Sequence, residues 1–157
     1  METISLRKVK KSDLTHFSLW WRDKDLIART SGEKKLLSNK EVQKYFNFLL
    51  ARDWEFMIMR GTKAIGHISL AKRAKGWYET QIIIGDKDEQ GKGYGTAAIK
   101  KLLQKVIKNK ISKIYLEVRP NNIRAIKAYE KCGFVATKII NYPRNKNLSQ
   151  TIRMEHK

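Results

Sequence analysis

The chain has 157 residues, of which 41% are hydrophobic, and this is enough apolar material to bury one core. No apolar run approaches the roughly 18 residues that a membrane-spanning helix needs, and the N-terminus lacks the apolar segment of a secretion signal. The lone cysteine, Cys132, excludes an internal disulfide. The sequence therefore predicts a single cytoplasmic domain over residues 1–157 with no membrane partner.

Charge is the unusual feature of the composition, with 34 basic and 15 acidic residues and a formal net charge of +19. The excess is concentrated in residues 90–157, which hold 16 basic and 3 acidic residues. Such a field attracts anions, including nucleotides and nucleic acid. A lysine-rich solvated surface explains the same count equally well, so charge alone does not identify a partner.

The N-terminal third of the chain predicts one strand followed by helices. In chain order these are a strand over 3–9, a helix from Ser12 or Asp13 to Trp21, a short helix over 25–30 closed by Ser31–Gly32, and a helix over 39–52. Ser38 and Glu41 form a capping box at the start of the last helix. The apolar stripes of these helices are expected to include Leu19 and Tyr45.

The rest of the chain alternates strands with single helices. Strands are expected over 55–59 and 63–71, joined by a turn at Gly61–Thr62, then over 77–84, 114–118, 134–141 and 150–156. One helix runs to residue 108 with Ile107 on its apolar side, and another runs from Asn121 or Asn122 to Gly133. This mixture predicts an α/β or mixed α+β fold with a mixed sheet.

A glycine-rich stretch, Gln90-Gly91-Lys92-Gly93-Tyr94-Gly95-Thr96, lies between the apolar run 81–84 and the helix that follows. Glycine lets the backbone approach a ligand closely, and the helix start supplies unpaired N–H groups and the positive end of the dipole. The stretch is therefore a candidate phosphate site. Its spacing matches neither the P-loop nor the dinucleotide-binding fingerprint.

The stretch resembles the acetyl-CoA loop of the GCN5-related N-acetyltransferases, Gln/Arg-x-x-Gly-x-Gly/Ala, through Gln90, Gly93 and Gly95. A second family signature follows over residues 118–134, with an Asn, a helix with Tyr129 near its end, and Gly-Phe. In pattern the chain is closest to the RimJ/RimL-like branch and the nucleotide-aminosugar N-acetyltransferases. The resemblance implies a central mixed, splayed, mostly antiparallel sheet flanked by about four helices, with acetyl-CoA as cosubstrate in the splay and no metal.

The resemblance also implies roles for individual residues. Tyr129 matches the general acid near the CoA sulfur, and Glu79, on the strand before the loop, matches the catalytic base. Each has a structural alternative, an aromatic filler for Tyr129 and a solvated carboxylate for Glu79. The implied acetyl-CoA contacts are Ile83, Ile84, Gly85, Gln90, Gly91, Lys92, Gly93, Tyr94, Gly95, Thr96, Asn122, Ala125 and Tyr129. Asn122 is also a candidate helix N-cap.

The family's first helices carry acceptor specificity, which makes Trp21 and Arg22 candidates for acceptor contacts, together with His67 on the sheet. Glu55 and His67 are weaker candidates for the base, and a water chain is a third. The charge of +19 favours a nucleotide amino sugar or a protein N-terminus over polycationic acceptors. The alternative function is a non-catalytic basic module that binds nucleic acid or senses CoA. Monomer and homodimer both remain open.

Overall fold

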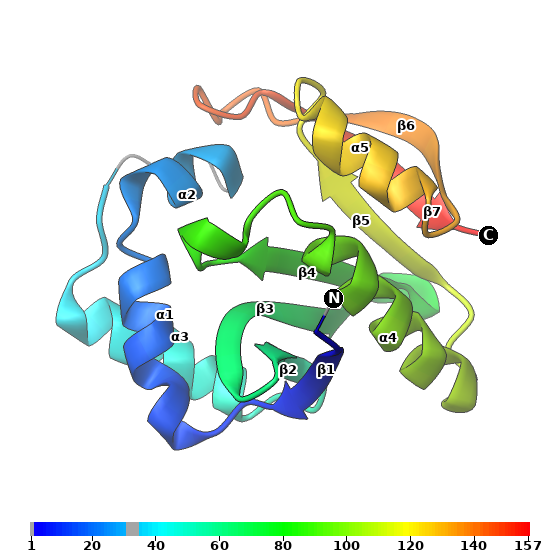
Figure 1. The fold of residues 1–157 in the computed structure, drawn as a ribbon. Helices are drawn as coiled ribbons and strands as arrows, with labels where there is room; N and C mark the ends of the chain where they lie inside the picture. The colour runs from blue at the N-terminus through cyan, green and yellow to red at the C-terminus, as the bar shows by residue number, and fades with distance from the viewer. Residues whose placement is uncertain (1, 31–34) are drawn as a thin grey trace.

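The computed structural model describes residues 2–30 and 35–157, and its centre is a seven-stranded sheet (Figure 1). The strands are β1 (Ile4–Lys8), β2 (Glu55–Arg60), β3 (Lys63–Lys72), β4 (Tyr78–Ile84), β5 (Ile114–Val118), β6 (Phe134–Asn141) and β7 (Gln150–His156). Their order in the sheet is β1-β2-β3-β4-β5-β7-β6. All neighbours are antiparallel except β4 and β5, so the predicted mixed, mostly antiparallel sheet is confirmed.

The helices cover both faces of this sheet. They are α1 (Leu14–Trp20), α2 (Lys24–Thr30), α3 (Asn39–Leu50), α4 (Tyr94–Lys108) and α5 (Ile123–Glu130), with 3-10 turns η1 (Lys11–Asp13), η2 (Ala74–Gly76) and η3 (Lys87–Glu89). Figure 1 shows α1–α3 on one side of the sheet and α4 with α5 on the other. The alternating side chains of the strands therefore face two different environments.

Two hydrophobic clusters form the core, one on each face. The larger packs α4 and α5 against the sheet and includes Ile58, Ile68, Leu102, Val106, Phe134 and Met154. The smaller packs α1–α3 on the opposite face and includes Phe17, Trp20, Phe46, Met57 and Met59. Because Ile58 and Met57 are neighbours in β2, that strand is buried on both faces, which is typical of the centre of a layered fold.

The capping box of α3 is confirmed, since Ser38 Oγ accepts the Glu41 N–H and the Glu41 carboxylate accepts the Ser38 N–H. Of the two predicted caps of α1, Ser12 and Asp13, Asp13 is the N-cap residue, but its side chain makes no capping hydrogen bond to the helix. The Asp13 carboxylate instead accepts the Lys10 N–H at 2.8 Å and pairs with the Arg7 guanidinium at 2.8 Å, because β1 brings Arg7 beside it. The predicted closure at Ser31–Gly32 lies outside the described residues.

Three helix positions predicted to be apolar contacts are exposed. Leu19 and Ile107 are 71% exposed and Tyr45 is 49% exposed. Each helix packs against the molecule along one side only, so the stripe that is buried is narrower than the stripe that is apolar. The helices lie where the sequence pattern predicts them, but fewer of their apolar positions are buried than the pattern indicates.

The only parallel pair in the described sheet separates soon after it forms. β4 and β5 pair at Tyr78–Ile114 and Glu79–Tyr115, and the two strands then diverge. Beyond these two pairs, the C-terminal half of β4 and the end of β5 are not paired with each other, and this opening in the sheet is called the slot below. The glycine stretch leads from that end of β4 into α4, so the splay and the glycine loop are placed together, as the family resemblance implies.

Candidate active site

The glycine loop turns through left-handed backbone conformations directly before α4. Gly91 has φ +74° and Gly93, the N-cap residue, has φ +84°. A Cβ atom built on Gly93 meets nothing within 4 Å, so the space in front of it is open. The first bond of the helix joins Ala97 N–H to Gly93 O, which leaves the preceding N–H groups without intrahelical acceptors. This is the geometry of an anion site at a helix N-terminus.

Polar side chains around the buried Glu89 hold the loop in place. Glu89 Oε1 forms ion pairs with Arg60 at 2.9 Å and with Lys63 at 3.2 Å. Gln90 Nε2 donates to Ile84 O at 2.8 Å, and Arg29 donates to Gln90 Oε1 at 3.3 Å. The side chain of Gln90 thus ties the loop to the end of β4.

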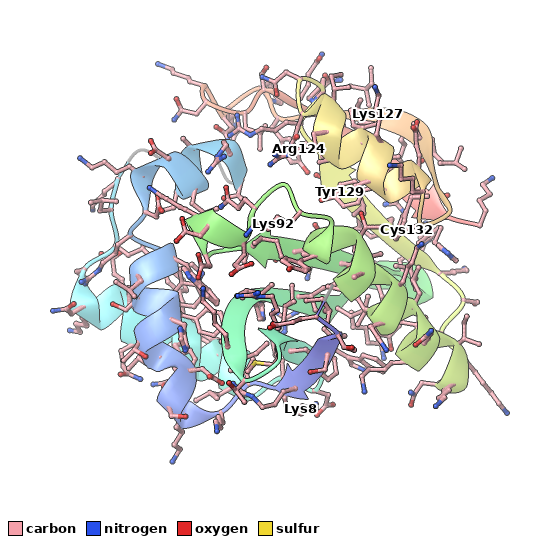
Figure 2. All side chains as sticks on the ribbon, in the orientation of Figure 1. Lys8, Lys92, Arg124, Lys127, Tyr129 and Cys132 are labelled. Carbon is pink, nitrogen blue, oxygen red and sulfur yellow. The ribbon has the colours of Figure 1, made fainter. Side chains whose placement is uncertain are left out.

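Two cations border the loop on its open side. Lys92 is half-exposed, with Nζ 3.7 Å from Glu89 Oε2. Arg124 reaches over from α5, and its Nη1 lies 3.2 Å from the Cβ position of Gly91. Figure 2 shows Arg124 and Tyr129 on the side of α5 that faces the glycine loop and α4. Arg124 was not among the predicted contacts, because only the tertiary structure brings the start of α5 to residue 91.

Tyr129 lies on α5 with its ring centroid 6.3 Å from that of Phe134. Burial, with a smaller contribution from the neighbouring Cys132 thiol, raises the pKa of Tyr129 to about 12. Its hydroxyl has no hydrogen-bond partner among the described residues. The phenol is therefore protonated at neutral pH, and its O–H can donate to a ligand. Asn122 Oδ1 accepts the Ala125 N–H at 3.2 Å and therefore caps α5, which leaves only its amide NH₂ for a ligand.

The backbone of β4 supplies donors to the slot. Tyr78 N–H points to β5, where it bonds Lys113 O, and Gly85 N–H points to β3, where it bonds Ile65 O. Since successive residues of a strand point their N–H groups in opposite directions, Ile82 and Ile84 direct theirs toward the slot. Of the three predicted backbone contacts, Ile84 faces the slot, whereas Ile83 and Gly85 face β3.

The face of the sheet opposite α4 carries the ionisable groups nearest the splay. Glu79, Gln81 and Ile83 share this face, because Ile82 and Ile84 pack with α4. Glu79 pairs with Arg73 at 2.7 Å. Its place is at the closed end of the splay, where β4 still pairs with β5.

Glu117 lies on the same face and was missed by the sequence analysis. Continuing the β4–β5 register places it opposite Gln81, two residues further into the splay than Glu79. Its Oε2 accepts hydrogen bonds from the hydroxyls of Tyr142 and Thr151, and it has no cationic partner among the described residues. The available signal was its position, alternate to the core residues of β5.

Trp21, Arg22 and His67 make contacts on the α1–α3 side. Arg22 donates to Leu37 O at 3.2 Å and also bonds the Asn39 side chain. The Trp21 ring lies 5.0 Å from that of Phe17. His67 Nε2 bonds Glu55 Oε2 at 2.6 Å, and its ring meets Phe17 edge-on. These contacts explain the packing of α1–α3 and leave the predicted acceptor roles of the three residues as proposals.

Within residues 2–30 and 35–157, no group of three or more His, Cys, Asp or Glu side chains is placed to hold a metal ion. In the same ranges, no helix combines the length and apolar character needed to cross a membrane.

The comparisons with known proteins agree with this geometry. The family model described as "Acetyltransferase (GNAT) domain" matches residues 3–135, and the chain belongs to this family. Among curated proteins, an aminoglycoside N(6')-acetyltransferase type 1 of Klebsiella pneumoniae is 25% identical over 150 residues, which cover 85% of this chain and 74% of that protein.

Solved structures show the same fold. The spermidine N-acetyltransferase of Vibrio cholerae, in complex with CoA and spermine, has a TM-score of 0.83 and 25% identity over 98% of this chain and 94% of its own. AAC(6')-Ib, in complex with ribostamycin and coenzyme A, has a TM-score of 0.83 and 20% identity over 99% and 93% of the two chains. The predicted enzyme class and its cosubstrate, acetyl-CoA, are confirmed. The comparisons do not bear out the RimJ/RimL-like branch.

Proposed function

We propose that this acetyl-CoA-dependent N-acetyltransferase transfers the acetyl group directly to a primary amine within the slot between β4 and β5. In this proposal the N–H groups at the start of α4, with Lys92 and Arg124, bind the phosphates. The N–H of Ile84 stabilises the carbonyl oxygen as it gains negative charge. The observation that carries the proposal is the junction of the splay with the left-handed glycine turn at Gly93.

The amine must lose a proton before it attacks, because an ammonium group has no lone pair. We assign this proton to Glu117, whose Oε1 has no partner among the described residues. The neutral amine then attacks the carbonyl carbon, the C–S bond breaks, and Tyr129 donates a proton to the departing thiolate. The nitrogen loses its second proton as the amide forms, and this proton restores the Tyr129 phenol. Glu79 remains the alternative base. Its ion pair with Arg73 at 2.7 Å makes it less available for an ammonium group.

The acceptor proposal follows from the charges around the slot. β2, β4, β5 and β7 place four glutamates on the face of α1–α3, and three of them, Glu55, Glu79 and Glu155, have ion-pair partners. Of these four glutamates, only Glu117 has no ion-pair partner among the described residues, and it is therefore the most available to neutralise an incoming ammonium group. A polycation needs several such carboxylates, whereas one carboxylate suits an acceptor with a single amine. A nucleotide amino sugar or a protein N-terminus meets this requirement and also fits the net charge of +19.

A polycationic amine is the second candidate, favoured by the similarity of this chain to an aminoglycoside acetyltransferase and a spermidine acetyltransferase. A thiol-release assay with acetyl-CoA separates the two candidates. The four acceptors to compare are a UDP-linked amino sugar, a peptide with a free N-terminus, kanamycin and spermidine. We expect the first or the second to have a kcat/KM at least about tenfold above both polycations, a difference of ~1.4 kcal/mol in transition-state binding. The reverse order would exclude our acceptor proposal.

A further inference from the structure

Tyr142 follows β6 directly, and its side chain crosses the sheet surface to β5. The phenol O–H donates to Glu117 Oε2 at 2.5 Å, and Thr151 Oγ1, from β7, donates to the same oxygen at 3.0 Å. Since β7 lies between β5 and β6, these two donors connect all three strands on the C-terminal side of the slot.

We propose that Tyr142 is a positioning residue that orients Glu117 toward the acceptor amine and thereby links the β6–β7 loop to the reaction. The inference rests on the role of Glu117 in the proposed function. It adds that the loop after β6 takes part in catalysis through a hydrogen bond and does not serve only as a connection between strands.

The two donors bind one oxygen of the Glu117 carboxylate and leave the other without a hydrogen bond among the described residues. An ionised carboxylate has two acceptor oxygens, and both O–H donors are on Oε2. They restrict the Glu117 side chain to one orientation and leave Oε1 for the ammonium group. Without the Tyr142 hydroxyl, only Thr151 would hold Oε2, and Glu117 would regain conformational freedom that has to be lost again in each reaction cycle.

Tyr142 also anchors the loop that it begins. Its N–H donates to Ser149 O at 2.7 Å, and its carbonyl accepts the Asn145 N–H at 3.0 Å. Burial, and the hydrogen bond with Glu117, raise the pKa of Tyr142 to about 12, so the phenol remains a donor throughout the neutral range. The backbone and the side chain of this one residue thus join the loop, β6 and the carboxylate.

A double-mutant cycle tests the inference, with the acceptor of highest kcat/KM among the four compounds named above. Tyr142→Phe deletes only the hydroxyl. We expect a loss of about tenfold in kcat/KM for the acceptor, while the KM for acetyl-CoA stays within about twofold. In a Glu117→Gln background the same substitution should have no further effect, because Tyr142 acts through Glu117. Tyr45→Phe on α3, at a half-exposed tyrosine, is the matched control and should leave all constants unchanged.

The outcomes distinguish the positioning role of Tyr142 from the proposed role of Glu117 as the base. A tenfold loss that persists in the Glu117→Gln background overturns the positioning role and leaves Glu117 as the base, and so does normal activity of Tyr142→Phe. Near-normal activity of Glu117→Gln itself overturns the base assignment and the inference with it. If Tyr142→Phe does not fold, Thr151→Val removes the other donor and should show the same lack of further effect without Glu117.

Discussion

The two sides of the slot differ in how they are packed. On the N-terminal side, β1–β4 lie between α1–α3 and α4, with a hydrophobic cluster on each face. On the C-terminal side, α5 has no fully buried residue, and β6 is mostly exposed beyond Phe134. On this C-terminal side, the sheet face turned away from α5 carries polar residues, among them Glu117 and Arg153. The C-terminal side contributes to only one of the two clusters, so its other face is free to carry polar groups next to the slot.

Glu117→Gln should strongly reduce acetyl transfer at the C-terminal side of the slot and leave the fold intact. A general base contributes about 10²–10⁴ in rate, so kcat/KM for the acceptor should fall by that factor at neutral pH. The melting temperature should change little, because the amide oxygen still accepts from Tyr142 and Thr151. Glu79→Gln is the matched variant at the closed end of the splay. A larger loss for Glu79→Gln would move the base back to that strand.

Leu102→Ala should lower the stability of the N-terminal side. Leu102 lies on α4 in the larger cluster and is fully buried. Truncating such a side chain removes buried apolar area and leaves a cavity, which costs about 2–5 kcal/mol of unfolding free energy. Urea denaturation measures the loss. A change below about 1 kcal/mol would show that α4 contributes less to stability than its burial indicates.

Tyr129→Phe should lower kcat by about 10- to 10³-fold, because its benefit exists mainly while the thiolate departs. Stability should change by no more than about 1 kcal/mol, since the hydroxyl has no partner to lose among the described residues. With a pKa of about 12, Tyr129 stays protonated below about pH 10, so it should not produce a basic limb in the rate profile at lower pH. Normal kcat with a lowered melting temperature would make Tyr129 a structural residue.

Gly93→Val tests the anion site at the boundary of the two sides. Gly93 has φ +84°, and a side chain there would enter the open space in front of the loop. We expect acetyl-CoA affinity to fall at least about tenfold, or ~1.4 kcal/mol, by calorimetry. Gly76→Val is a close control, with φ +78° and open space but a position in η2. Both variants should lose similar stability from backbone strain, and equal affinities would contradict the loop assignment.

Ile139→Thr is expected to have the smallest effect. Ile139 lies on β6 and is exposed, so exchanging it for another β-branched residue should change the unfolding free energy by no more than about 0.5 kcal/mol. Chemical denaturation provides the measurement. A loss above 1 kcal/mol would mean that β6 is covered in solution, for example by a second copy of the chain.

Local features of the sequence determined much of this protein. Ser38 and Glu41 specified the start of α3, the Gly61–Thr62 turn specified the β2–β3 hairpin, and the glycine stretch specified the start of α4. These features are readable because their causes act within a few residues: capping bonds, left-handed backbone conformations and alternating burial. The family signatures then identified the enzyme class, and the cosubstrate with it.

Tertiary structure alone decided which side chains meet. Arg7 pairs with the Asp13 carboxylate, Arg73 pairs with Glu79, and Arg124 reaches Gly91 across more than thirty residues of sequence. Tyr142, from the loop after β6, and Thr151, from β7, reach Glu117, the residue that we propose as the base. Sequence spacing does not encode such pairings, because they depend on strand order and register, and these are set by the packing of the whole sheet.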